Sequence, residues 1–162
     1  MLFRSNAVTL EMLWTRLISI VDEAAAALVR TSFSTIVRES NDFACVLTDA
    51  RGRSMAQATD SIPSFIGTVP RTIRHFLKEF PVETLDPGDV LVTNDIWLGT
   101  GHLPDITCAK PLFLKGKLVG FAGSVAHAPD IGGKMRSADA REVFEEGLQI
   151  PVMKVRSEEH TS

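Results

Sequence analysis

The sequence predicts an α+β domain in which a long N-terminal helix and a second helix pack on mostly antiparallel strands. Apolar residues recur at three- and four-residue steps over 8–30, which is typical of an amphipathic helix. A second helical pattern covers 65–80. Two strand-like runs, 106–114 and 117–125, are separated only by a Lys-Gly pair, which indicates a β-hairpin and therefore antiparallel pairing.

The composition is that of an ordinary globular domain. Of 162 residues, 44% are hydrophobic and 23% are charged, which suffices for one domain with its own core. The net charge of −3 gives no basic stripe for nucleic acid. The longest apolar runs fall short of the ~20 residues of a membrane span, and the N-terminus shows no signal-peptide pattern. We therefore expect neither nucleic acid nor membrane as a partner.

The two cysteines, Cys45 and Cys108, lie in strand-like apolar runs and lack the spacing of a metal site. Buried free thiols of this kind are typical of proteins in the reducing cytosol. We expect both thiols to be free and the protein to be cytoplasmic.

The N-terminal helix, predicted over 8–30, is the clearest element. Thr9 is the expected N-cap, and about 22 residues would give a helix roughly 33 Å long. We interpret this helix as scaffold rather than as part of a reactive site. The stripe expected to face the core comprises Leu10, Leu13, Trp14, Leu17, Ile20, Val21, Ala24 and Leu28.

A polar segment and a pair of strands follow the first helix. Residues 38–42 could line a site or serve as a surface connection, and the sequence leaves both interpretations open. The compact apolar run 43–47 predicts a strand. A turn at 49–52, in which Gly52 supplies a positive φ, leads to the expected return strand 53–57.

The second helix, predicted over 65–80, carries apolar residues at helical steps. Pro70 falls in its first turn, where a missing N–H costs nothing. His75, in the middle of this helix, is expected to be a surface or half-buried residue rather than a ligand.

A short buried strand at 90–93 leads into the segment that carries the chemistry. It delivers Asn94 and Asp95 at its C-terminal end, and a glycine-rich loop then leads to His102. Four glycines in this region could allow backbone N–H groups to face an anion: Gly99, Gly101, Gly132 and Gly133.

The hairpin brings two distant segments together. If the Lys-Gly pair forms a two-residue turn, the numbers of paired residues sum to 231. His127 then lies opposite Pro104, next to Asp105 and diagonal to His102. Opposed Cβ atoms are about 5 Å apart and diagonal ones about 7–8 Å. On a strict pleat Asp105 would face away from His102, and a slip of one residue would turn every side chain over.

Two imidazoles and one carboxylate at this range suit a divalent transition metal such as Mn, Fe or Zn. We therefore predict His102, Asp105 and His127 as metal ligands, with the remaining positions open to water or substrate. Asp95 and Asp130 are the expected catalytic carboxylates, which would orient a ligating imidazole or act as a general base. The alternative is a polar hairpin mouth shaped by glycine turns.

Three stretches of the chain resemble the hydantoinase B/oxoprolinase family. They are Asp42-Phe-Ala-Cys-Val-Leu47, Asn94-Asp-x-Trp-x-Gly-Thr-Gly-His-Leu-Pro-Asp-Ile106 and His127-x-x-Asp-Ile-Gly-Gly133, of which the middle one is the most specific. The family includes the B-type component of ATP-dependent N-methylhydantoinase, the C-terminal half of 5-oxoprolinase and a large subunit of acetone carboxylase.

The resemblance implies an ATP-dependent enzyme that opens a cyclic amide such as hydantoin or 5-oxoproline. An A-type subunit would activate the substrate with ATP, and this B-type subunit would complete the hydrolysis within a hetero-oligomer. No Walker pattern occurs in the chain, which agrees with ATP binding by the partner. Two other interpretations stay open: a subunit of an ATP-dependent ketone carboxylase, and a non-catalytic assembly subunit.

For the metal, the resemblance implies manganese, held at positions that match His102, Asp105 and His127. Ala128 departs from the pattern, because many relatives have a second histidine there. This departure leaves the exact metal coordination and the substrate of the chain open.

Members of this family are several times longer than the chain. We therefore expect residues 1–155 to be the N-terminal portion of a larger hydantoinase B/oxoprolinase domain, inactive in isolation, with apolar surface exposed along the first helix and the hairpin. Residues 156–162 match what a common sequencing adapter encodes in frame, so we expect a non-native tail, which removes His160 from the ligands. A solvated polar terminus is the alternative.

Overall fold

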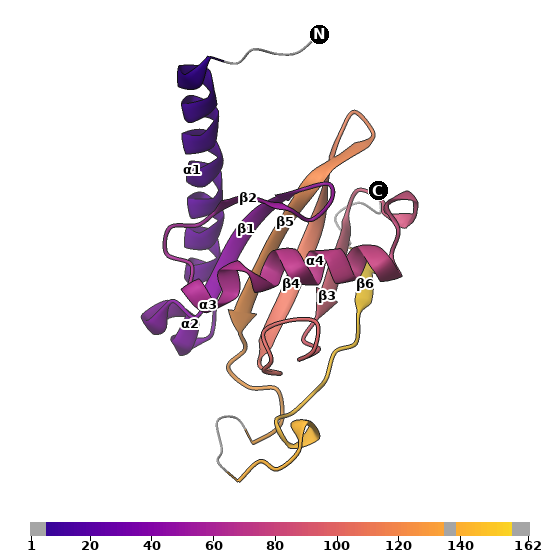
Figure 1. Cartoon of the computed structure of the whole chain (residues 1–162). Helices are drawn as coiled ribbons and strands as arrows, with labels where there is room; N and C mark the ends of the chain where they lie inside the picture. The colour runs from indigo at the N-terminus through magenta and orange to yellow at the C-terminus, as the bar shows by residue number, and fades with distance from the viewer. Residues whose placement is uncertain (1–5, 135–138, 157–162) are drawn as a thin grey trace.

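The computed structural model describes residues 6–134 and 139–156. In this part of the chain, one six-stranded antiparallel sheet has the strand order β2-β1-β5-β4-β3-β6 (Figure 1). The strands are β1 (Phe43–Asp49), β2 (Ser54–Gln57), β3 (Asp89–Thr93), β4 (Asp105–Leu114), β5 (Lys117–His127) and β6 (Met153–Arg156). The helices are α1 (Ala7–Thr31), α2 (Thr35–Ser40), α3 (Pro63–Ile66) and α4 (Thr68–Glu79), with short 3₁₀ turns η1 (Val82–Thr84) and η2 (Val143–Glu145). The predicted α+β class is confirmed.

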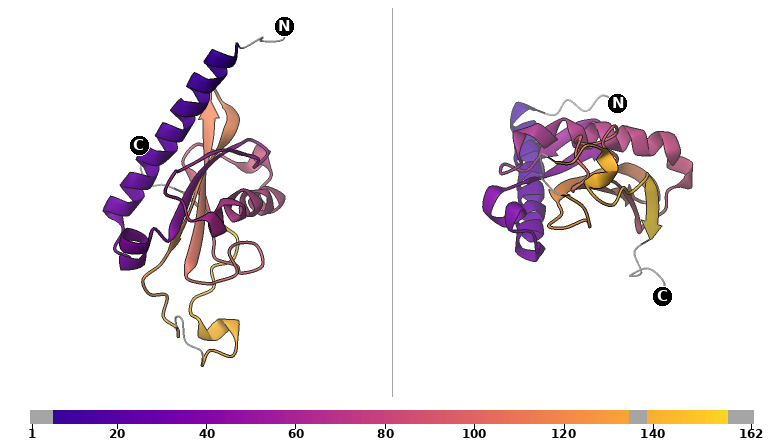
Figure 2. Two further views of the ribbon diagram at one scale, coloured as in Figure 1. Left: turned by 60° about the vertical axis from the view of Figure 1, so that its left-hand side comes forward. Right: turned by 90° about the horizontal axis from the view of Figure 1, so that it is seen from below.

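Helices cover both faces of the sheet at β1, as Figure 2 shows. Side chains alternate along a strand, so Ala44 and Val46 face α4 while Phe43 and Cys45 face α1. Burial on both faces explains why this strand is a continuous apolar run rather than an alternating one.

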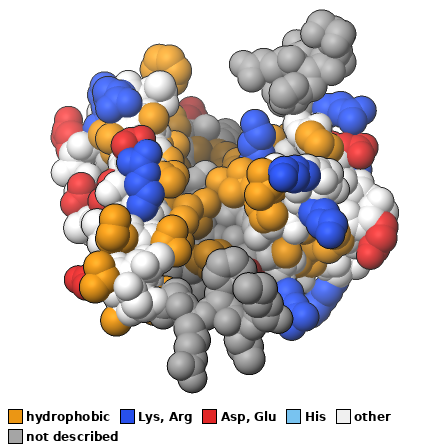
Figure 3. Space-filling model, turned by 90° about the horizontal axis from the view of Figure 1, so that it is seen from above, with side chains coloured by type: hydrophobic (Ala, Val, Ile, Leu, Met, Phe, Trp, Pro, Cys, Tyr) orange, Lys and Arg blue, Asp and Glu red, His pale blue; other side chains and the backbone are white. Residues whose placement is uncertain are grey.

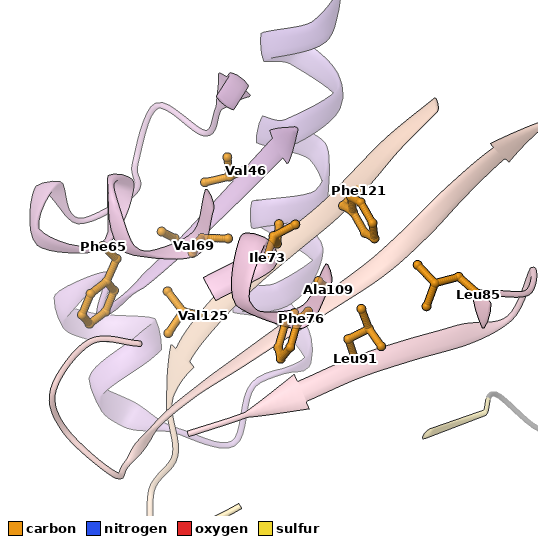
Figure 4. Close-up of a cluster of buried hydrophobic side chains, with 11 residues drawn as sticks. Val46, Phe65, Val69, Ile73, Phe76, Leu85, Leu91, Ala109, Phe121 and Val125 are labelled. Atoms are coloured by element: carbon orange, nitrogen blue, oxygen red, sulfur yellow. The ribbon is translucent and has the colours of Figure 1, made fainter. Parts of the chain in front are cut away.

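The main core lies between α4 and the sheet (Figure 4). The single helix expected over 65–80 is divided at Gly67 into α3 and α4, and Pro70 lies in the first turn of α4 as expected. His75 is half-buried, as expected. The buried residues of this core are Ala44, Val46, Phe65, Val69, Ile73, Phe76, Leu85, Leu91, Ala109, Phe121 and Val125.

Only the C-terminal half of α1 packs on the sheet. The helix is capped by Asn6, whose Oδ1 accepts from the backbone N–H of Thr9 at 2.8 Å, so the predicted cap at Thr9 is wrong by three residues. Val21 and Ala25 are buried, whereas Leu10, Leu13, Trp14, Ile20 and Ala24 of the predicted stripe are exposed. Leu10, Leu13 and Trp14 are exposed because the N-terminal part of the helix projects beyond β1 and β2 (Figure 1), whereas Ile20 and Ala24 line an open groove.

An apolar groove runs between α1 and the opposite face of β1 and β5. It has a volume of about 320 Å³ and is lined by Ile20, Val21, Ala24 and Leu28 of the helix, with Cys45 and Ala122 among the strand residues. Figure 3, which views the molecule from above, shows hydrophobic side chains gathered near the middle of that end. Leu114 and Val119 of the hairpin are also exposed, so apolar surface lies where the sequence indicated it.

The hairpin between β4 and β5 contains a bulge. Its turn is the expected one, because Lys115 and Gly116 have positive φ values of 51° and 75°. Leu112, however, pairs with Gly120, which leaves Val119 without a partner. From there on the paired numbers sum to 232 (112 + 120) rather than 231, so the predicted register is wrong by one residue at the far end.

The cysteines, the helices and the predicted tail were the remaining subjects of the sequence expectations. Cys45 is a buried free thiol and Cys108 a partly buried one. Among the described residues, no helix is both long and apolar enough to cross a membrane. Arg156 closes β6 opposite Asp89, while the rest of the predicted tail, 157–162, lies outside the described residues.

Candidate metal centre

Asp42, His127 and Asp105 lie side by side in one row across three neighbouring strands. Asp105 pairs with His127, and the β1–β5 register brings Asp42, directly before β1, to the other side of His127. The backbone N–H of His127 donates to the carbonyl of Asp42 at 3.2 Å. His127 follows the core residue Val125 by two positions, so the row belongs to the α4 face of the sheet.

The three side chains of this row converge. Nδ1 of His127 is 3.1 Å from Oδ1 of Asp105 and 3.8 Å from Oδ2 of Asp42. One donor atom of each residue lies within 4.8 Å of the other two. His127 is only 2% exposed and Asp105 only 5%. Charged groups this deeply buried require hydrogen bonds, an ionic partner or a metal.

The second ring nitrogen of His127 distinguishes this row from an ordinary ion pair. Nε2 is buried and has no hydrogen-bond partner in the part of the chain that the structure describes. Buried polar side-chain atoms are almost always paired. Two carboxylate oxygens and an imidazole nitrogen form a donor set that fits a divalent cation such as Mn²⁺, Fe²⁺ or Zn²⁺. Because both carboxylates face Nδ1, the unpartnered Nε2 lies outside this donor set and is a separate observation.

His102 lies against the row rather than within it. Its ring stacks on that of His127, with centroids 5.5 Å apart and an angle of 25° between the planes. Its Nδ1 faces Oε2 of Glu146 at 3.3 Å. The predicted ligands His102, Asp105 and His127 are thus neighbours, but the three donor atoms that converge are those of Asp42, Asp105 and His127.

Asn94 fixes the loop that carries His102. Its side chain is almost completely buried and bonded on both of its polar atoms. Nδ2 donates to the carbonyls of Leu103 and Leu148 at 2.7 and 2.8 Å, and Oδ1 accepts from the N–H of Ile150 at 2.5 Å. One amide therefore joins the end of β3, the His102 loop and the segment that precedes β6.

The two predicted catalytic carboxylates, Asp95 and Asp130, are not part of the converging group. Oδ1 of Asp95 accepts from the N–H of Trp97 at 2.8 Å, and Oδ1 of Asp130 accepts from the N–H of Gly132 at 2.7 Å. Each carboxylate therefore caps a turn. The N–H of Gly99 donates to the carbonyl of Asp95 at 2.9 Å. Because these two glycine N–H groups are used within the protein, the expectation that they face an anion is wrong.

Sequence reasoning left Asp42 open and missed Glu146 entirely. Asp42 belonged to a polar segment, 38–42, that could equally be a surface connection. Two signals were available: Asp42 begins one of the three family-like stretches, and it stands directly before the apolar run 43–47. Asn41 ends α2 just before it, in the left-handed region at a φ of 51°. Glu146 offered no comparable signal, because its partner His102 is far away in sequence.

A profile of the hydantoinase B/oxoprolinase family matches residues 6–162 of the chain. The chain belongs to the hydantoinase B/oxoprolinase family. It is 34% identical over 156 residues to a protein of Pseudomonas sp. (strain NS671) described as the B-type component of a D-/L-hydantoinase, covering 93% of the chain and 26% of that relative. It is 38% identical over 154 residues to 5-oxoprolinase 1 of Arabidopsis thaliana, covering 93% and 12%.

Two solved structures share the fold of this family member. The ATP-dependent caprolactamase of Pseudomonas jessenii matches with a TM-score of 0.80 and 28% identity, over 96% of the chain and 27% of that protein. Nucleotide-free acetone carboxylase matches with a TM-score of 0.78 and 28% identity, over 91% and 20%. The chain therefore spans between about an eighth and a quarter of these relatives.

Proposed function

We propose that this chain supplies a metal centre to the B-type subunit of an ATP-dependent cyclic-amide hydrolase. The substrate class is a hydantoin or 5-oxoproline, which a separate A-type subunit activates with ATP before this subunit completes the hydrolysis in a cytoplasmic hetero-oligomer. Relatives named as a hydantoinase subunit and as 5-oxoprolinases support this proposal. Their greater length supports residues 1–155 as a portion of a larger domain of this family.

The observation that carries the proposal is the convergence of donor atoms from Asp42, His127 and Asp105, of which His127 and Asp105 are buried. His102, stacked on His127, provides a second imidazole next to it. Manganese is the favoured ion, because carboxylate oxygens with imidazole suit it and the family resemblance implies it. A bound divalent ion would polarise a carbonyl or lower the pKa of a bound water.

The chain's own residues hold and orient these groups. The carboxylate of Asp105 fixes the ring of His127 from one side, and Asp42 approaches the same nitrogen from the other. Proton transfer by Asp95 and Asp130 stays a prediction, with each carboxylate now placed at a turn.

Elemental analysis of the purified chain after equilibration with Mn²⁺ tests the metal centre. We expect one bound ion in the wild type, none in His127→Ala and an unchanged content in His75→Ala. His75 is a matched control because it lies on α4, outside the row. A folded wild-type chain without metal would reject the metal centre and leave the row as hydrogen-bonded acid–base groups.

The structural likeness to acetone carboxylase favours a second candidate, an ATP-dependent ketone carboxylase that uses the same row. In a complex with the A-type subunit, a carboxylase consumes bicarbonate, whereas a hydrolase releases a ring-opened acid. His102→Ala in a full-length relative separates both from a non-catalytic assembly role. Loss of turnover with an intact complex supports catalysis, and unchanged turnover rejects it.

A further inference from the structure

Glu146 makes two contacts that converge on the His102 loop. Its Oε2 lies 3.3 Å from Nδ1 of His102 and accepts a hydrogen bond from the backbone N–H of Leu103 at 3.2 Å. The two side chains are 27% and 31% exposed, so the pair lies at the rim of the buried row rather than inside it. One carboxylate oxygen thus faces the ring of His102 and accepts from the backbone of the next residue.

The chemistry of this contact determines which ring nitrogen carries the proton. An ionised carboxylate only accepts hydrogen bonds, so its approach to Nδ1 favours a proton on that nitrogen. In a neutral imidazole with Nδ1–H, the other nitrogen, Nε2, keeps its lone pair. Carboxylates that hold the remote nitrogen of an imidazole in this way orient ligating histidines in many metal sites.

Three glycines allow the close backbone packing around Glu146. Gly132 forms an isolated bridge with Gly147, and a Cβ at Gly133 would overlap the carbonyl carbon of Glu146. A side chain at Gly147, whose φ is 135°, would overlap Ile131. The Gly132–Gly133 pair, a few residues after His127 in the sequence, therefore provides the surface on which the Glu146 segment packs.

A second set of contacts holds the same segment from the other side. Asn94 bonds the carbonyl of Leu148 and the N–H of Ile150, and it also bonds the carbonyl of Leu103. The Glu146 segment and the His102 loop are therefore joined to one buried amide. This common anchor fixes the carboxylate and the imidazole relative to each other.

We propose that Glu146 is a positioning residue that holds His102 through Nδ1–H and so leaves its Nε2 as an electron-pair donor beside the Asp42–His127–Asp105 row. The role of this electron-pair donor rests on the proposed function, because it would bind the metal ion or the substrate of that site. The contact itself requires no metal. The two can therefore be tested separately.

Two-bond ¹H–¹⁵N NMR spectra of the ¹⁵N-labelled, metal-free chain at pH 8 report the protonated nitrogen of each imidazole. A His102→Gln variant assigns the signals. We expect Nδ1–H for His102 in the wild type and in Glu146→Gln, whose amide oxygen still accepts, and a shift toward Nε2–H in Glu146→Ala. Glu145→Gln is the matched control, because Glu145 instead pairs with Lys134 at 3.2 Å.

Metal binding is the second readout, measured as the dissociation constant for Mn²⁺. We expect Glu146→Ala to weaken binding about 10–100-fold, with Glu145→Gln unchanged and Glu146→Gln in between. Circular dichroism on each variant confirms that the fold is retained.

The outcomes separate the two proposals. An Nε2–H form of His102 in the wild type overturns the inference without any variant, as does an unchanged form in folded Glu146→Ala. If the wild type shows Nδ1–H and Glu146→Ala shifts it, but no metal binds, the positioning role stands and the metal centre alone fails. Metal binding that is unaffected by folded Glu146→Ala contradicts the positioning role.

Discussion

Asp105 and His127 lie directly opposite each other on β4 and β5, with 3.1 Å between Oδ1 and Nδ1, because of the unpaired residue Val119. In the bulge-free register His127 would have faced Pro104 instead. Residues that are directly opposed across antiparallel strands point to the same face. The bulge therefore places the carboxylate and the imidazole together on the α4 side.

The acidic members of the row can be tested individually. We expect Asp42→Asn and Asp105→Asn each to weaken Mn²⁺ binding at least about tenfold, since each removes a charged oxygen that faces Nδ1 of His127. Isothermal titration with Mn²⁺ measures the effect. Asp60→Asn, at an exposed position, is the control, and equal affinity in all three variants would exclude the row as the binding site.

Replacement of Asn94 by Ala should destabilise the fold by about 2–4 kcal/mol, because the carbonyls of Leu103 and Leu148 and the N–H of Ile150 lose their partner. Urea unfolding gives the change. Asn6→Ala, which removes only the cap of α1, should cost about 1 kcal/mol. A smaller loss for Asn94→Ala than for Asn6→Ala would contradict the role of Asn94 as an anchor.

Gly123 marks the closest approach of β5 to α4. A Cβ at this position would lie 2.6 Å from Cγ1 of Val69, so Gly123→Ala should cost about 1–3 kcal/mol through overpacking. Gly67→Ala meets nothing within 4 Å and has a helical backbone, so it should stabilise by up to about 1 kcal/mol. Thermal unfolding measures the melting temperature of each variant. We expect it to fall in Gly123→Ala and to rise in Gly67→Ala.

Burial raises the pKa of the Cys45 thiol from 9.0 to about 11. Between these values the unfolded chain loses the proton while the folded chain keeps it, so stability is full below pH 9 and falls as the pH rises toward 11. A shift of this size corresponds to about 3 kcal/mol. Urea midpoints at pH 8 and 10 should differ less in Cys45→Ala than in the wild type, and parallel curves would refute the assignment.

Local patterns in the sequence were sufficient for much of the fold. Helical periodicity located α1 and α4, and the Lys115–Gly116 pair located the turn of the hairpin. Both features depend on residues that are close together in the chain. The exposure of Trp14 was not predictable, because the length of the sheet beneath α1 is a tertiary property.

The site was only partly predictable for the same reason. The hairpin brought Asp105 and His127 close, but the bulge has no sequence mark, since Val119 looks like any other strand residue. The approach of Asp42 depends on the pairing of β1 with β5, two strands that are far apart in the sequence. No local pattern encodes that pairing.

The row across three strands also links the site to the order of folding. A hairpin closes a short loop and forms early, whereas β1 can join β5 only after a long intervening chain has been closed at a greater entropic cost. An intermediate with only the hairpin would hold Asp105 and His127 without Asp42. Cation affinity would then rise in two stages during refolding, first when the hairpin forms and again when β1 pairs with β5. The second rise would report when β1 docks.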